Sequence, residues 1–117
     1  MGKLTKEDII LLFLEDPKKL AIKIYNKQVP KSDEMRTLIC ELGNPDCAYW
    51  YALCIDNGPH FLTRKIACQT PARAFQYALY ADCEPTEETR AKVQECSSHK
   101  RWYENWEKSL GSIIKKH

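Results

Sequence analysis

Six cysteines and three histidines are the side chains of this sequence best suited to nucleophilic or metal chemistry. A metal site needs clustered ligands, typically at C-x2-C or H-x3-H spacing. Cys40, Cys47 and Cys54 are seven residues apart, but a Gly-Asn-Pro sequence between the first two would interrupt a shared helix face. The sequence also contains no glycine-rich phosphate loop and no G-x-S-x-G elbow. We expect small buried thiols, no metal, no cofactor and no enzymatic activity, and only a Cys–His pair assembled by folding stays open.

An even number of cysteines also allows three disulfides, the arrangement typical of small secreted domains. The only candidate for a targeting segment is Ile9–Leu14, six apolar residues between acidic flanks. It is too short and too acidic at its edges for a signal peptide or a membrane span. We therefore expect a cytoplasmic protein with reduced cysteines and no membrane association.

Basic residues form the first candidate binding surface. Lys19, Lys23 and Lys27 are four residues apart and would line one face of a helix, which could meet phosphates or an acidic protein. Arg64 and Arg90 share a repeat position and could extend this basic strip. The lysines also fit a solvated helix face, and 18 basic against 16 acidic residues leave a net charge of only +2. Nucleic-acid binding is therefore the alternative hypothesis.

A repeat of 26 residues organises the middle of the chain. Residues 44–52 (NPDCAYWYA) return as residues 70–78 (TPARAFQYA). The same 26-residue step relates four tyrosines: Tyr25, Tyr51, Tyr77 and Tyr103. Alanines accompany the two inner tyrosines at i, i+3 and i+4, the spacing of a helical core stripe. We expect all four tyrosines to pack in the core with their hydroxyls at its edge.

The second candidate surface is aromatic. Three consecutive aromatic residues centred on Trp50 spread over about 200° of a helix, so they cannot all face one core. Trp50, Gln76 and Trp102 share one repeat position away from the core stripe, with Tyr80 and Trp106 one turn further on. That side is either buried between neighbouring helices or displayed, and displayed Trp and Tyr residues are common anchors of protein interfaces. These five residues are the predicted partner-binding site.

Proline, glycine and N-cap signals divide the chain into about eight short helices and leave no room for a sheet. We expect them at about residues 5–15, 17–28, 33–42, 45–56, 60–69, 71–83, 87–96 and 97–111, with a basic tail at 112–117. Short helices alternating at a fixed period predict an all-α fold of stacked antiparallel hairpins, a small α-solenoid or a compact helical repeat domain. The 117 residues would form one domain, with an N-terminal helix and units at 17–44, 45–70, 71–96 and 97–111.

The P-x-x-A-[YF]-x-Y-A units resemble short helical repeats of uncharacterised bacteriophage and bacterial proteins, often written D-P-x-x-A-Y-x-Y-A. The resemblance covers about residues 44–83 well and the two ends loosely. The resemblance implies an all-helical repeat array and allows the chain to be encoded by a phage. It implies no shared activity and identifies no functional residues.

Two functions follow as expectations. The first is a non-enzymatic module whose aromatic surface binds a protein; for a phage protein this partner would be a host enzyme or defence complex that it inhibits. The second is a nucleic-acid-binding helical repeat that uses the basic strip. The sequence leaves the identity of the partner and the oligomeric state open.

Overall fold

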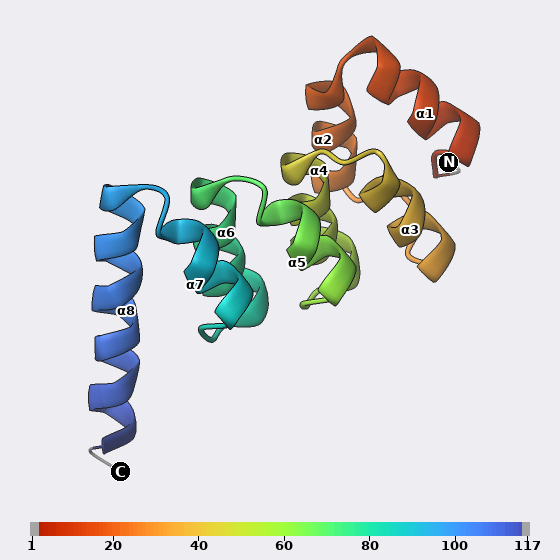
Figure 1. Ribbon diagram of the computed structural model, residues 1–117. Helices are drawn as coiled ribbons and strands as arrows, with labels where there is room; N and C mark the ends of the chain where they lie inside the picture. Colours follow the sequence, from red (N-terminus) through yellow and green to blue (C-terminus); the bar gives the residue numbers. More distant parts are fainter. Residues whose placement is uncertain (1–2, 116–117) are drawn as a thin grey trace.

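Helices arranged in two rows make up this protein (Figure 1). The computed structural model describes the backbone of residues 3–115 and the side chains of residues 3–110, and no strand occurs within these limits. The first row holds α1 (Lys6–Glu15), α3 (Asp33–Glu41), α5 (Phe61–Ala67) and α7 (Glu87–Val93). The second row holds α2 (Pro17–Tyr25), α4 (Pro45–Trp50), α6 (Pro71–Tyr77) and α8 (Ser97–Lys115). The predicted all-α fold of stacked antiparallel hairpins is confirmed.

Two π-helical segments continue helices of the second row. The segment η1 (Tyr51–Asp56) follows α4, and η2 (Ala78–Asp82) follows α6. Asn57 ends the first segment in a left-handed conformation with a φ of 57°, which asparagine adopts more readily than most residues. The π-helical geometry itself was not predicted.

The starts of the helices follow the predicted caps. In the second row the side chains of Asp16, Asn44 and Thr70 accept backbone N–H groups of the first turn, and each is followed by proline. Proline is favoured there because its missing N–H would have no helical partner at that position. Four further N-cap residues begin the helices of the first row: Thr5, Ser32, His60 and Thr86.

Helix α2 ends earlier than predicted. It stops at Tyr25 instead of reaching residue 28. Lys27 is left-handed with a φ of 61°, and the N–H groups of Lys27 and Gln28 donate to the carbonyls of Ile24 and Lys23, both at 2.9 Å. These bonds form a Schellman motif, which usually has glycine at the left-handed position. A lysine there gave no sequence signal for the stop, so Lys27 lies beyond the helix that was expected to carry it.

Helix α8 ends later than predicted. It continues through Gly111 to Lys115, so most of the predicted tail at 112–117 is helical, and residues 116–117 lie outside the described part. A single glycine weakens a helix by about 1 kcal/mol relative to alanine but does not by itself end one.

The first hairpin is out of register with the others, and this places Tyr25 on the surface. Tyr51, Tyr77 and Tyr103 each stand six residues after the residue that opens their helix, whereas Tyr25 stands eight residues after Pro17. Two residues correspond to about 200° of rotation around a helix. Tyr25 is accordingly 57% exposed, while the other three tyrosines are completely buried. The expectation that all four tyrosines lie in the core was wrong for Tyr25.

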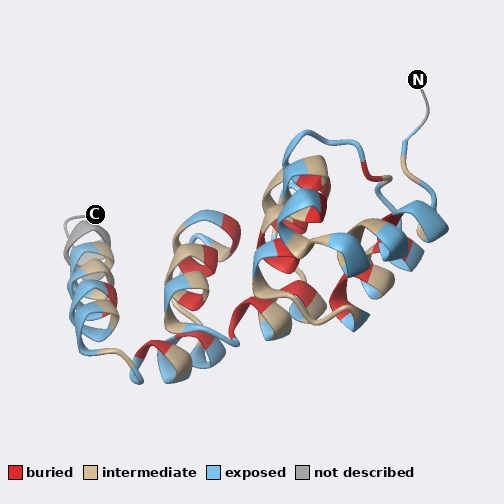
Figure 2. Ribbon diagram, turned by 90° about the horizontal axis from the view of Figure 1, so that it is seen from above, coloured by how far each residue is buried: buried red, intermediate tan, exposed pale blue. Residues whose placement is uncertain are grey.

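Three apolar clusters follow one another along the stack, between the two rows (Figure 2). Each is built around one of the repeated tyrosines. The first is the largest because α1 and α2 add leucine and isoleucine side chains, whereas the other two rely on alanines that let the helices approach closely. The core therefore lies on the mutually facing sides of the helices and leaves their outward sides exposed.

The buried tyrosines fasten the two helices of each hairpin together. The Tyr77 hydroxyl accepts the N–H of His60, the N-cap of α5, at 2.9 Å and lies 2.7 Å from the buried Thr63 hydroxyl. Tyr103 makes the same contacts with Thr86 and Thr89 at 3.2 and 2.7 Å. The Tyr51 hydroxyl accepts the N–H of Ser32 at 3.2 Å and donates to the carbonyl of Pro30 at 3.0 Å. Each hydroxyl therefore holds the start of a first-row helix.

Removing one such hydroxyl should destabilise the fold measurably. We expect Tyr77→Phe to lower the free energy of unfolding by about 1–3 kcal/mol, because the His60 N–H and the Thr63 hydroxyl lose a buried partner. Tyr77→Ala should cost about 3–5 kcal/mol, because it also empties the space of the ring. Urea denaturation measures both.

The matched control is Tyr25→Phe. The hydroxyl of this exposed tyrosine makes no hydrogen bond that the structure records, so the stability should change by no more than about 0.5 kcal/mol. Equal losses for Tyr77→Phe and Tyr25→Phe would contradict the role assigned to the buried hydroxyls.

Candidate functional site

The outward side of the second row carries a run of large apolar side chains, which we name the aromatic strip. Helices α2, α4, α6 and α8 lie side by side in that order, so equivalent positions on them form a line (Figure 1). The fifth residue after the one that opens each helix gives Ile22, Trp50, Gln76 and Trp102. The strip is made of five residues: Ile22, Tyr25, Trp50, Tyr80 and Trp102.

Trp50 joins the first two helices of the strip. Its ring meets Tyr25 of α2 edge-on, with centroids 5.1 Å apart, and meets Tyr49 at 5.0 Å. Trp50 is half-buried and also packs against the first two apolar clusters. The sequence left open whether Trp50 is buried between helices or displayed on the surface. The ring is partly packed between helices and partly exposed.

Arg73, which the sequence analysis did not single out, connects α4 with α6. Its guanidinium lies 4.7 Å from the Tyr49 ring centroid and 5.6 Å from that of Trp50, as in cation–π contacts. It also donates to Asp46 and to Gln76, both at 2.7 Å. Gln76, a predicted partner-binding residue, thus holds Arg73 in place. Its contacts with Tyr49, Trp50 and Asp46 cross to α4, so its own place in the sequence gave no signal.

The other predicted aromatic residues divide into exposed and packed ones. Tyr80 and Trp102 are 62% and 47% exposed. Trp106 is half-buried and packs edge-on against Tyr103 with centroids 5.4 Å apart. Tyr80 and Trp102 are therefore available on the surface, whereas Trp106 mainly supports the third apolar cluster.

A hollow of about 390 Å³ opens at the N-terminal end of the strip. Ala21, Ile22 and Tyr25 of α2 and Trp50 of α4 line it. Ile22 and Tyr25 are both more than half exposed, so much of the apolar surface of the walls is left uncovered by the described chain. This hollow was not predicted, because the 26-residue step placed Tyr25 in the core.

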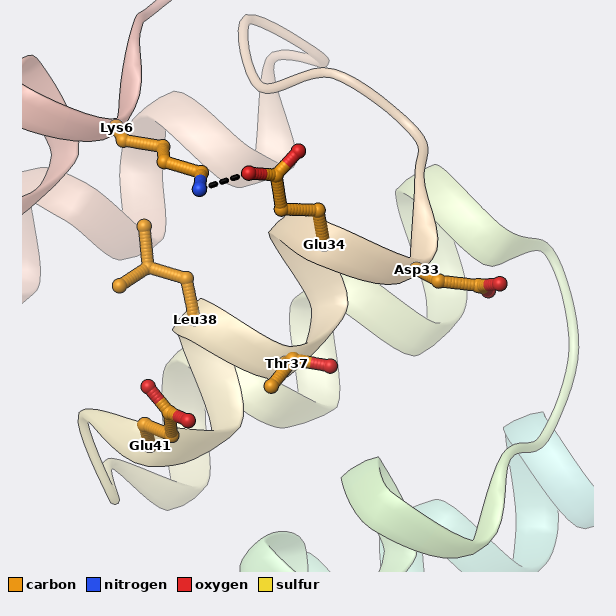
Figure 3. Close-up of a pocket in the computed structure, with 6 residues that line it drawn as sticks. All are labelled: Lys6, Asp33, Glu34, Thr37, Leu38 and Glu41. Carbon is orange, nitrogen blue, oxygen red and sulfur yellow. Dashed lines mark ion pairs between the residues drawn. The ribbon is translucent and has the colours of Figure 1, made fainter.

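A second hollow, of about 350 Å³, lies between α1 and α3 (Figure 3). Lys6 of α1 reaches toward Glu34 of α3 and forms an ion pair with it, while Asp33 points away. Asp33 instead binds Arg36 at 2.6 Å. The polar side chains here fasten α1 to α3. Among the residues that the structure describes, no group of three or more His, Cys, Asp or Glu side chains could hold a metal ion.

Three arginines at equivalent positions each bind a carboxylate of the second helix in the same hairpin. Each arginine stands four residues after the N-cap of its helix. The pairs are Arg36 with Asp56 at 2.8 Å, Arg64 with Asp82 at 2.5 Å, and Arg90 with Glu107 at 2.8 Å. Hydrogen bonds to these carboxylates raise the pKa values of all three arginines, so the guanidinium groups stay charged.

The type of helix decides which residue supplies the carboxylate. Asp56 and Asp82 belong to π-helical segments and follow a buried tyrosine by five residues. Glu107 belongs to α8 and follows Tyr103 by four. Because π-helices bond i to i+5 and α-helices i to i+4, each carboxylate lies one turn beyond its tyrosine on the same side.

The structure does not bring the predicted basic residues together into one surface. Arg64 and Arg90 are occupied by the carboxylates described above, and Lys19 contacts Glu15 at 2.5 Å. Lys23 takes the place in α2 that the buried tyrosines take in the other second-row helices and is half-buried. Lys27 lies past the end of α2.

Folding does assemble one Cys–His pair. The Cys96 thiol lies 3.0 Å from Nδ1 of His99, at the start of α8. Three other thiols are buried, and burial raises the pKa of Cys40 to about 11 and those of Cys47 and Cys68 to about 12. All six cysteines are free.

Truncating the equivalent arginines should have unequal effects. Arg64→Ala leaves Asp82, whose side chain is 1% exposed, as a buried charge without its partner, and should cost about 3–5 kcal/mol of unfolding free energy. Arg90→Ala breaks an exposed pair and should cost about 1 kcal/mol or less. Chemical denaturation compares the two, and equal costs would contradict a dependence on burial.

The thiols should react in three groups with Ellman's reagent at pH 8. Cys83 and Cys96 should react fast, because the first is exposed and the second partly exposed beside His99. Cys54 should react slowly, since partial burial raises its pKa. The three buried cysteines should react only after unfolding, because the thiolate is the reactive form. Cys83→Ser and Cys96→Ser should each remove one fast equivalent, and more than two fast equivalents would contradict this assignment.

Comparison with known proteins gives no relative for this chain. No family model, no curated protein and no solved structure matches it. No helix within residues 3–115 is long and apolar enough to cross a membrane. The function is therefore inferred from the surfaces of the chain itself.

Proposed function

We propose that this protein is a non-enzymatic binding module that docks on a partner protein through the aromatic strip. The observation that carries the proposal is the exposure of four large apolar side chains along one row of helices: Ile22, Tyr25, Tyr80 and Trp102 are 58%, 57%, 62% and 47% exposed. Large exposed apolar patches are uncommon in monomeric proteins and mark interaction sites, and within the strip Tyr25 and Trp50 are in direct contact.

The chemistry of the strip supports a protein partner. Tyr and Trp are the residues enriched at the energetic centres of protein interfaces, because they bury much area with few rotatable bonds. Trp50 is held between Tyr25 and Arg73, so part of this surface is already ordered before binding. On the phage resemblance, we propose a host enzyme or defence complex as the partner, which binding would inhibit.

The basic-strip alternative receives less support. Three of its five residues form ion pairs within the chain, which leaves fewer charges for phosphate groups. A phosphate-binding surface should also lose affinity steeply between about 50 and 200 mM salt, whereas an aromatic contact should not.

Replacing the two exposed aromatic residues at the C-terminal half of the strip should abolish partner capture. Wild-type protein and the Tyr80→Ala/Trp102→Ala variant are each immobilised and then exposed to lysate of the host cells, with nuclease present. We expect the wild type to retain a protein at both about 50 and about 200 mM salt. The amount of this protein retained by the variant should be at least about tenfold lower, because the substitutions remove interface anchors. Mass spectrometry identifies it and quantifies the loss.

The matched control changes apolar side chains of similar exposure on the first row. Leu14 and Phe61 are 74% and 66% exposed and lie outside the strip. The Leu14→Ala/Phe61→Ala variant should capture the partner as the wild type does. Equal capture by all three proteins, or capture that is lost between about 50 and 200 mM salt, would contradict the proposal.

A further inference from the structure

The hollow at the N-terminal end of the strip combines an apolar interior with cationic surroundings. Lys18, Ala21, Ile22 and Tyr25 follow the i, i+3, i+4, i+7 spacing, so Lys18 lies on the same face of α2 as the walls of the hollow. Both Lys18 and Tyr25 are exposed. The lysine thus stands at the end of the hollow where α2 begins.

Lys27 stands near the opposite end. It follows Asn26, the C-cap of α2, and its charge opposes the burial-induced rise in the pKa of Cys54, which stands one turn after Trp50. Arg73 adds a third cation over the Trp50 ring, although Asp46 neutralises it. Within the described chain, neither Lys18 nor Lys27 forms an ion pair.

This combination selects among possible occupants. A cationic side chain would be repelled by the two lysines, and a purely polar one would gain nothing from the apolar walls. An aromatic side chain fits walls made of Ile22, Tyr25 and Trp50, and the volume falls in the range of about 300–1,000 Å³ typical of binding pockets. Carboxylates on either side of that ring would meet the two lysines.

The separation of the lysines constrains the spacing of the carboxylates. Lys18 and Tyr25 are about 10 Å apart along the helix at 1.5 Å per residue, and Lys27 lies just beyond. In an extended peptide, residues i and i+4 are about 13 Å apart, and residues i, i+2 and i+4 point to the same side. An acid-x-aromatic-x-acid segment can therefore present all three side chains to the hollow.

We propose that the hollow between α2 and α4 binds an acidic, extended segment of the partner protein that inserts an aromatic side chain between Ile22, Tyr25 and Trp50 while its carboxylates meet Lys18 and Lys27. This rests on the proposed function for the class of partner and adds the chemistry of the segment that is recognised. The hollow is separate from Tyr80 and Trp102, so the two proposals can be tested independently.

The test uses synthetic peptides and ¹H–¹⁵N NMR titration of the full chain. The probe peptide contains Glu-Ser-Phe-Ser-Glu flanked by Gly and Ser residues. Three comparison peptides each carry one change: Phe replaced by Ala, both Glu replaced by Lys, or both Glu moved to one side of Phe. We expect shifts of the Trp50 indole and of α2 amides with the first peptide. Binding of each of the other three peptides should be at least about tenfold weaker, because an anchor, the charge match or the spacing is lost.

Matched protein variants locate the site. Ile22→Glu places a negative charge in the hollow, the same sign as the carboxylates of the peptide. Lys18→Glu/Lys27→Glu reverses the charge beside the hollow. Each variant should bind the probe peptide at least about tenfold more weakly than the wild type does. Lys65→Glu/Lys108→Glu, which changes two exposed lysines elsewhere, and Tyr80→Ala/Trp102→Ala should bind it as the wild type does. Circular dichroism checks that each variant is folded.

The outcomes separate the two proposals. If the first peptide binds no better than the other three, or equally well to Ile22→Glu, the inference about the hollow is overturned, even where partner capture still depends on Tyr80 and Trp102. If the peptide pattern is as expected but no protein is captured through the strip, the proposed function fails while the specificity of the hollow stands.

Discussion

The hydrogen bond that the N-cap N–H of a first-row helix donates to a buried tyrosine hydroxyl is the constraint on which this stack depends. A first-row helix of seven to nine residues is too short to be stable alone, and its first N–H groups have no helical partner. The hydroxyls of Tyr51, Tyr77 and Tyr103 satisfy one such group while their rings fill the apolar cluster below. Capping, hairpin closure and core packing thus meet at one side chain, and the arginine–carboxylate pair one turn away fixes the same hairpin at its edge.

Much of this architecture could be predicted from local signals. Caps followed by proline located the starts of α2, α4 and α6 because Asp16, Asn44 and Thr70 act through adjacent backbone groups. What failed were features that depend on geometry without a residue signature. A left-handed Lys27 ended α2 early, and two π-helical segments changed the spacing between tyrosine and carboxylate from four to five. A repeat step measured in residues also assumes constant register, and two additional residues in the first unit were enough to turn Tyr25 outward.

The candidate site was predicted in part, for a related reason. Periodicity predicted one shared repeat position for Trp50, Gln76 and Trp102. In the structure the helices that carry them, α4, α6 and α8, lie side by side in that order. It could not distinguish the packed ring of Trp106 from the exposed one of Trp102, because that depends on how far neighbouring helices approach each other. Arg73 escaped notice because its importance comes from three contacts across the gap between α4 and α6, not from its own repeat position.

The first hairpin shows how stability and binding surface are linked in such an array. It has neither a buried tyrosine bond nor an arginine–carboxylate pair; Ile9 stands where the other first-row helices carry arginine, and α1 and α2 contribute the largest apolar cluster instead. Because ordinary apolar packing holds this unit, its tyrosine is not needed inside, and the shifted register delivers the ring to the surface beside Trp50. The same two-residue shift that breaks the repeat therefore contributes an exposed aromatic wall to the hollow between α2 and α4. In the inner units the equivalent change would remove a buried hydrogen bond, so a hollow of this kind would cost more stability there than in the first hairpin.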